Sequence, residues 1–237
     1  MKTLLMRLKA MRTRGAIGAL LVLAATACGG AARQSAQADP QPGGGGLSAA
    51  EIEAIYRARL DSARMRFTDA DVDFITGMVG HHAQALVMSG LAPANGANPS
   101  IQTLAARIIN SQQDEIAIMQ RWLRDRDQPV PEVEIEGTNL MVHGAEHAMH
   151  MPGMLTPEQM RELEQARGPA FDRLFLTYMI QHHRGAVTMV GELFSHNGAG
   201  QGDAVFKLAS DINADQLTEI ERMERMLAAL PAQGDSR

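Results

Sequence analysis

The stretch DVDFITGMVGHHAQALVM, residues 71–88, occurs a second time in altered form as DRLFLTYMIQHHRGAVTM, residues 172–189. A shift of 101 residues superimposes the two copies, and eight of the 18 positions are identical: Asp, Phe, Thr, Met, His, His, Ala and Met. At 100° per residue, the shared Phe, first Met, first His, Ala and last Met fall on a helical stripe under about 90° wide. Each copy is therefore predicted to be a helix with its first His inside and its second His at the edge of the stripe.

A second pair of matching segments follows the first. With a shift of 104, the Gln, Glu-Ile, Met, Arg and Leu of residues 112–123 recur in residues 216–227. Their Gln, Glu, Met and Leu recur at helical spacing, which predicts a polar and apolar stripe that faces the inner His of the first helix.

Each half of the chain, residues 68–126 and 170–230, thus has the pattern of one αα-hairpin. One hairpin cannot bury its apolar stripe alone, whereas two can close on each other. The sequence predicts an all-α four-helix bundle within a domain of residues 48–230, with an extra N-terminal helix opened by the capping box of Ser48. Residues 127–155 are predicted to be a loop between the repeats, and no strand is expected.

The N-terminal residues 1–27 have the pattern of a secretory signal, with five basic residues and an apolar run too short to span a bilayer permanently. Small residues precede Cys28, as in a bacterial lipobox, so Cys28 is predicted to be lipidated; ordinary cleavage with a free thiol is the alternative. Residues 28–47 are predicted to be a flexible linker. The protein is expected to be secreted across the inner membrane and lipid-anchored in the cell envelope, facing the periplasm or the exterior.

Charge and cysteine content exclude several functions. Cys28 is the only cysteine, so an intrachain disulfide and a thiolate metal site are both excluded. Without residues 1–27 the chain has 17 basic and 27 acidic residues, a net charge of −10. Nucleic-acid binding depends on cationic contacts with phosphate, so no nucleic-acid partner is expected.

The repeated helices supply the candidate metal ligands of the core. A carboxylate on an apolar stripe is costly unless it is paired, so the facing Glu and Gln residues are predicted to be co-ligands or partners that orient an imidazole. The alternative is that the histidines are structural and the methionines fill gaps. The candidate ligands are Met78, His81, His82, Met88, Met179, His182, His183 and Met189, and their candidate partners are Gln112, Glu115, Gln216 and Glu219.

A His- and Met-rich segment lies between the repeats. Seven of the 14 residues in MVHGAEHAMHMPGM, residues 141–154, are His or Met, in a predicted loop with no core to fill. Imidazole and thioether together suit copper, particularly Cu(I), and Ag(I). The candidate ligands in this segment are His143, His147, Met149, His150 and Met151.

The motif Asp-x-x-Phe-x-x-x-Met-x-x-His-His-x-x-Ala-x-x-Met, present twice, resembles the hallmark of the domain-of-unknown-function family 305. The Gln-x-x-Glu-Ile pattern of residues 112–116, its weaker form at 216–220 and the segment MPGMLTPEQ, residues 151–159, extend the resemblance over residues 67–230. The resemblance implies a ferritin-like helical bundle in a secreted or lipid-anchored bacterial protein. It also implies copper or silver binding in the periplasm, as in some members, through the paired histidines and their flanking methionines.

The leading hypothesis is an envelope protein that binds copper, with Cu(I) favoured, or silver for sequestration or homeostasis. Catalysis is not expected under this hypothesis. One alternative is a ferritin-like non-haem metal oxidoreductase that uses the histidines with Glu115 and Glu219. The other is a non-catalytic interaction module whose histidines are structural.

Overall fold

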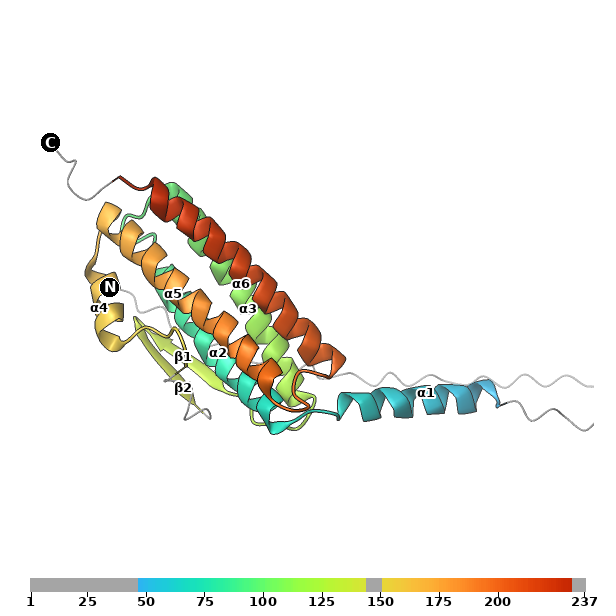
Figure 1. Cartoon of the computed structure of the whole chain (residues 1–237). Coiled ribbons are helices and arrows are strands. Elements are labelled where there is room, and N and C mark those ends of the chain that lie inside the picture. Colours follow the sequence, from blue (N-terminus) through green and yellow to red (C-terminus); the bar gives the residue numbers. More distant parts are fainter. Residues whose placement is uncertain (1–46, 144–150, 232–237) are drawn as a thin grey trace, which may run out of the picture.

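The computed structural model describes residues 47–143 and 151–231, and this part of the chain is mostly helical (Figure 1). The predicted helical class is therefore confirmed, apart from one β-hairpin. The elements in chain order are α1 Ala49–Arg64, α2 Asp69–Gly90, α3 Pro99–Arg124, β1 Glu132–Glu136, β2 Asn139–His143, α4 Pro157–Gln165, α5 Gly168–Ser195 and α6 Asp203–Ala229.

The four long helices pack as two hairpins. Helix α2 lies against α3, α5 lies against α6, and α2 and α5 contact each other (Figure 1). Asp71, at the start of α2, accepts a hydrogen bond from the N–H of Gly200 in the α5–α6 loop, at 2.7 Å. In return, Asp172 near the start of α5 accepts one from the N–H of Asn98 in the α2–α3 loop, at 3.0 Å. The Asp that opens each copy of the repeated stretch thus ties its helix to the other hairpin.

Buried apolar side chains form two cores, one toward each end of the long helices. One core includes Phe171 and the other includes Leu193, although both residues belong to α5. Along α2, buried apolar residues up to Val79 belong to the second core and those from Ala85 onward to the first. A polar stretch separates the two groups in the middle of each long helix.

Helices α2 and α4 each begin at a capping box, formed by Thr68 and by Thr156. The Thr68 hydroxyl accepts from the N–H of Asp71 at 3.2 Å, and the Asp71 carboxylate accepts from the N–H of Thr68 at 2.8 Å. Thr156 and Gln159 form the same reciprocal pair before α4, at 3.3 and 2.9 Å. Each capping box satisfies N–H groups that have no partner within the first helical turn, so the local sequence determines where these helices begin.

The prediction that residues 127–155 form a loop without strands was wrong. Strands β1 and β2 pair antiparallel, with Glu132 opposite His143 and Glu136 opposite Asn139. The sequence EVEIE of β1 alternates charged and apolar residues, which is the period of a strand. Gly137 follows with φ of 63°, a conformation that suits glycine in the tight turn between the strands. The alternation is short and only half apolar, which makes it easy to miss among helical segments.

Helix α1 projects away from the long helices (Figure 1), and neither core includes any of its residues. Its large apolar residues are solvent-exposed, with 56% of Ile52 and 58% of Tyr56 accessible. In the described part of the chain, no helix is both long and apolar enough to cross a bilayer. The candidate site residues therefore belong to the unit formed by α2, α3, α5 and α6.

Candidate metal centre

A buried polar layer lies between the two apolar cores. Helices α2 and α5 contribute the four paired histidines, all of them 0% exposed, and α3 and α6 contribute a Gln and a Glu each. Burying this many polar groups is unfavourable unless they find partners or a ligand. The layer consists of His81, His82, Gln112, Glu115, His182, His183, Gln216 and Glu219.

His81 of α2 and His182 of α5 stack against each other across the helix interface, with ring centroids 3.9 Å apart and ring planes at 39°. His81 Nε2 lies 3.0 Å from the main-chain carbonyl of Pro152, so Nε2–H donates and Nδ1 keeps its lone pair in the neutral ring. Nδ1 of His81 and both ring nitrogens of His182 are buried and have no hydrogen-bond partner among the described residues. Two neighbouring imidazoles thus have buried ring nitrogens without a hydrogen-bond partner in the described part of the chain.

Burial lowers the pKa of His81 from 6.5 to about 3, and the neighbouring His82 lowers it further. Burial and the charge of the facing His81 likewise hold the pKa of His182 well below its ordinary value. Both rings are therefore neutral at physiological pH. Neutral imidazole is the form that ligates metals, because the lone pair is free of a proton.

The second histidine of each pair bonds a carboxylate on the neighbouring helix. His82 Nε2 lies 2.7 Å from Glu115 Oε2, and His183 Nε2 lies 2.6 Å from Glu219 Oε2. A carboxylate that accepts from Nε2–H orients the ring and leaves Nδ1 as the lone-pair nitrogen of the neutral tautomer. Nδ1 of both rings is buried without a partner among the described residues.

This arrangement corrects the predicted orientation of the pairs. The sequence predicted that the first His faces the Gln and Glu stripe and that the second lies at an edge. In the structure the first histidines, His81 and His182, face each other, and His82 and His183 meet the glutamates. Consecutive helix positions point about 100° apart, and each of α2 and α5 has two long-helix neighbours, so adjacent residues face different helices. The buried face of each helix therefore includes both histidines of the pair and is wider than the stripe predicted from the repeat motif.

The glutamines of the layer are buried, and further acidic groups lie near its glutamates. Gln112 is 1% exposed and Gln216 2%, and both amide atoms of Gln112 and the Gln216 Oε1 lack a described partner. Burial raises the pKa of Asp215 on α6, and the charges of Glu115 and Glu219 raise it further. Carboxylates of α3 and α6 thus lie close enough to one another to interact.

The four predicted methionine ligands are buried on either side of the layer. Met78 and Met189 belong to one apolar core, and Met88 and Met179 belong to the other. Met78 and Met179 precede the inner histidines by one helical turn on the same face. In the described residues no three His, Asp or Glu side chains are placed to hold a metal together as they stand. An ion at the layer would therefore need thioether ligands or rotation of an imidazole.

Residues 71–227 match the family model described as "Domain of unknown function (DUF305)". The chain belongs to the DUF305 family. No curated protein matches this DUF305 chain. The family resemblance drawn from the repeated motif is thereby confirmed.

Solved DUF305 structures share the fold of this chain. A DUF305 fragment from Deinococcus radiodurans is 29% identical with a TM-score of 0.57, over 69% of this chain and 99% of that one. A Streptomyces coelicolor DUF305 protein, whose name presents it as secreted, is 28% identical with a TM-score of 0.55, over 67% and 91%. CopM in its Cu(II)-bound form is 30% identical with a TM-score of 0.51, over 67% and 95%. CopM structures also include a Cu(I)-bound and an Ag-bound form.

The loop candidates of the DUF305 chain divide into described and undescribed residues. His147, Met149 and His150 lie outside the described residues, as does Cys28. His143 ends strand β2. Met151 is the loop candidate that the structure brings beside a helical one, because it and Met189 line the same pocket.

Sequence reasoning singled out residues 151–155 but did not predict that they pack across α2 and α5. The Pro152 carbonyl contacts His81, and Leu155 exchanges two hydrogen bonds with the Gln84 side chain, at 2.8 and 3.1 Å. A Cβ on Gly185 of α5 would lie 1.9 Å from the Pro152 oxygen. Glycines inside a helix signal such a close backbone approach, and Gly185 was the available clue.

Proposed function

We propose that this DUF305 protein binds copper, as Cu(I), or silver ions in the cell envelope, for sequestration or homeostasis. The observation that carries the proposal is the buried histidine layer, in which His81, His82, His182 and His183 all retain ring nitrogens without a described partner. Soft monovalent ions accept imidazole and thioether ligands. Solved CopM structures named as Cu(I)-, Cu(II)- and Ag-bound support the choice of metal.

The proposed ligands at the layer are the four histidines together with Met78, Met88, Met179 and Met189. Glu115 and Glu219 orient His82 and His183 through the hydrogen bonds described above, and Gln112 and Gln216 complete the polar surroundings. The loop residues His143, His147, Met149, His150 and Met151 collect ions at lower affinity.

We further propose how the metal-binding unit is built and how it is held in the envelope. The two hairpins form a ferritin-like four-helix bundle, a closure supported by the two apolar cores, to each of which α3 and α6 both contribute. Residues 1–27 direct secretion, lipidated Cys28 anchors the mature chain, and residues 28–47 tether the bundle. The Streptomyces coelicolor relative, whose name presents it as secreted, supports this location.

The test is Cu(I) titration of the apo protein in competition with a chromophoric Cu(I) chelator. The wild-type protein is expected to bind at least one Cu(I) that the His81→Ala, His82→Ala, His182→Ala, His183→Ala variant does not bind. If circular dichroism shows that the fourfold variant does not fold, the His81→Gln, His182→Gln variant replaces it in the titration. This double variant keeps both His–Glu pairs. His196→Ala, at an exposed histidine outside the layer, is the matched control.

Unchanged stoichiometry and affinity in a folded layer variant would disprove the site. If the variant keeps its copper affinity but loses much of its stability, the histidines are structural. The His82–Glu115 and His183–Glu219 hydrogen bonds are the observation that favours this alternative.

A further inference from the structure

Helix α1 concentrates the exposed apolar surface of the protein. Among the described residues, twelve large apolar side chains are exposed, and six of them lie in residues 47–65. The other six are distributed over α3, the β-hairpin, α5 and α6. Helix α1 also projects away from the long helices (Figure 1). Apolar surface gathered on one short segment in this way indicates a partner that covers it.

The large apolar residues of α1 share one side of the helix. At 100° per residue, Ile52, Tyr56 and Leu60 fall within about 80° of the helix circumference, and Ile55 widens this side. Arg59 projects between Ile52 and Ile55 on the same side. The helix is therefore amphipathic, with one cationic side chain inside its apolar side.

The position of Arg59 favours a lipid surface over a protein partner. In an apolar seam between two helices, its guanidinium would be buried at a cost in free energy unless a carboxylate faced it. At a lipid surface, the carbon stem of an arginine lies along the apolar region while the guanidinium reaches the phosphates. Tyr56 likewise combines an apolar ring with a polar hydroxyl, and such residues are enriched at membrane–water interfaces.

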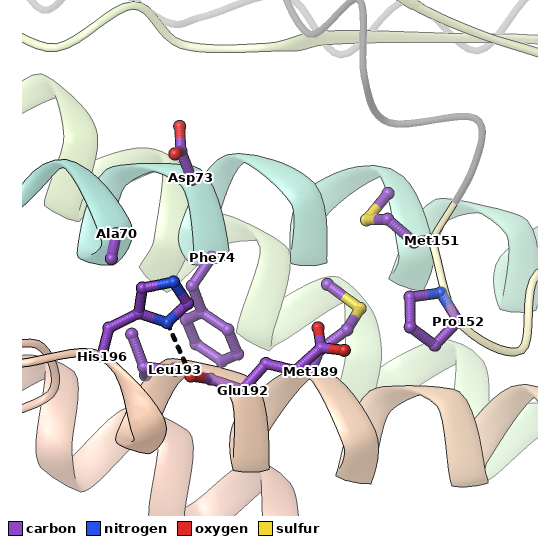
Figure 2. Close-up of a pocket in the computed structure, with 9 residues that line it drawn as sticks. All are labelled: Ala70, Asp73, Phe74, Met151, Pro152, Met189, Glu192, Leu193 and His196. Carbon is purple, nitrogen blue, oxygen red and sulfur yellow. Dashed lines mark hydrogen bonds between the residues drawn. The ribbon is translucent and has the colours of Figure 1, made fainter.

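Charge separates the α1 segment from the rest of the chain. Residues 47–66 have four basic and three acidic residues, a net charge of +1, whereas residues 67–237 have 12 and 23, a net charge of −11. Figure 2 shows two of the exposed carboxylates, Asp73 on α2 and Glu192 on α5, beside the pocket between these helices. Anionic headgroups repel such a surface, so α1 is the part suited to contact them.

The proposed lipid anchor lies close to α1 along the chain. Cys28 precedes Leu47, where the described chain begins, by 19 positions. A flexible chain of that length has an average end-to-end distance of about 25 Å. Helix α1 has 16 residues and is therefore about 24 Å long. An anchor at Cys28 would hold α1 near the bilayer at a high effective concentration, so that even a weak affinity keeps it there.

We propose that α1 lies on the surface of the membrane that holds the anchor, with Ile52, Tyr56 and Leu60 in the boundary between headgroups and acyl chains and Arg59 on lipid phosphates. The inference rests on the lipid anchor of the proposed function, to which it adds a second, non-covalent membrane contact. Amphipathic helices bind in this orientation, with strength set by the apolar area buried and by attraction to anionic lipids.

The test is cosedimentation with vesicles of equal parts phosphatidylglycerol and phosphatidylethanolamine. The parent protein is the full mature chain with Cys28→Ser, so that no acyl chain contributes, and it is expected to bind. Ile52→Ser, Tyr56→Ser, Leu60→Ser should bind at least about tenfold more weakly, because the apolar area is lost. The matched control, Ala50→Ser, Ala54→Ser, Ala58→Ser, adds three serines on the opposite side and should bind as the parent does.

The charge is tested by a second pair of variants. Arg59→Gln should weaken binding to these vesicles about fivefold. Arg57→Gln removes the same charge outside the apolar side, where Arg57 donates to Glu53 at 2.8 Å, and should weaken it less.

Two outcomes overturn the inference: a parent chain that does not bind the vesicles, and equal binding by the two serine variants. A parent chain that ignores vesicles but forms a dimer, which the apolar-side variant dissociates, would assign α1 to an interface between copies instead. The proposed function fails separately, through loss of Cu(I) binding or through unmodified Cys28 in mass spectra of protein from its own host. Neither readout depends on vesicle binding by α1.

Discussion

His81 and His182 occupy the same position in the two copies of the repeated stretch, and they stack on each other with ring centroids 3.9 Å apart. Their sequence neighbours show the same equivalence, because His82 bonds Glu115 and His183 bonds Glu219. Because the two copies contact each other through equivalent residues, each side chain that one copy contributes to the interface is matched by an equivalent one from the other copy. The interior therefore contains a matched set of imidazoles and carboxylates, which is the feature that distinguishes this helical unit from one with an all-apolar core.

The neutral inner histidines predict that the apo protein loses stability in mild acid. The pKa of His81 is about 3 in the folded state and 6.5 when unfolded, so the unfolded chain binds more protons between these values and stability falls as pH drops through this window. From pH 7.5 to 5, His81 alone should account for about 2 kcal/mol of the unfolding free energy. Urea denaturation followed by circular dichroism at the two pH values measures the loss.

The acid sensitivity is assigned by comparison of variants. His81→Gln, His182→Gln should show a smaller difference between pH 7.5 and 5, because Gln does not titrate. His196→Gln, at an exposed site, should retain the wild-type difference. Equal differences in all three proteins would show that the inner histidines do not govern the acid response.

The two His–Glu pairs predict unequal costs for removal of their carboxylates. Glu115→Ala leaves the buried His82 Nε2–H without its acceptor and should lower the unfolding free energy by about 1–3 kcal/mol. Glu219→Ala should cost less, because the Glu219 side chain is 21% exposed against 12% for Glu115, and water can replace the lost acceptor. Chemical denaturation of the apo variants at pH 7.5 measures both.

The control for the pairs is Glu224→Ala, which breaks the exposed ion pair with Arg184. Exposed ion pairs contribute little, so its effect should stay below about 1 kcal/mol. A Glu115→Ala variant no less stable than Glu224→Ala would refute a stabilising role for the His82–Glu115 bond.

Gly185 and Gly191, on the same helix, predict opposite effects of one substitution. In Gly185→Ala the new Cβ would lie 1.9 Å from the Pro152 oxygen and 2.6 Å from the Gly153 Cα, so the segment of residues 151–155 must shift. Such overpacking should destabilise the protein by about 1–3 kcal/mol. A Cβ on Gly191 meets nothing within 4 Å, so Gly191→Ala should stabilise the helix by about 0.5–1 kcal/mol.

Thermal and urea denaturation of these two variants test the packing of the segment. Faster proteolysis within residues 151–155 in Gly185→Ala would show that the segment has lifted from α2 and α5. Stabilisation by both alanines would mean that the segment does not pack on Gly185.

The sequence predicted the members of the polar layer but not their pairing. Helical periodicity placed His81, His182, Gln112 and Glu115 in the interior, but it placed His82 and His183 only at the edge of the stripe, although all four histidines are 0% exposed. Periodicity does not show which neighbouring helix a side chain meets, so the contact of His82 rather than His81 with Glu115 was missed. The Pro152–His81 contact joins residues 71 positions apart through a main-chain carbonyl, which no side-chain pattern records.

The reciprocal contacts of Asp71 and Asp172 predict a shared role in holding the hairpins together. Asp71 accepts from the main-chain N–H of Gly200 as well as capping α2, and Asp172 accepts from the N–H of Asn98. Asp71→Ala loses the capping box and the contact between hairpins, so it should cost about 2–4 kcal/mol, and Asp172→Ala, which loses one bond to a charged group, about 1–3 kcal/mol. Asp69→Ala, at an exposed first-turn position, should cost under about 1 kcal/mol.

Urea denaturation of the single variants and of the Asp71→Ala, Asp172→Ala double variant measures these costs. The two contacts lie at opposite ends of the α2–α5 interface, so their costs should add within about 0.5 kcal/mol if the unit unfolds in one step. A double variant that loses one hairpin in a separate, earlier transition would show that the hairpins fold independently. That outcome would contradict the mutual dependence expected from the shared histidine layer, to which both hairpins contribute.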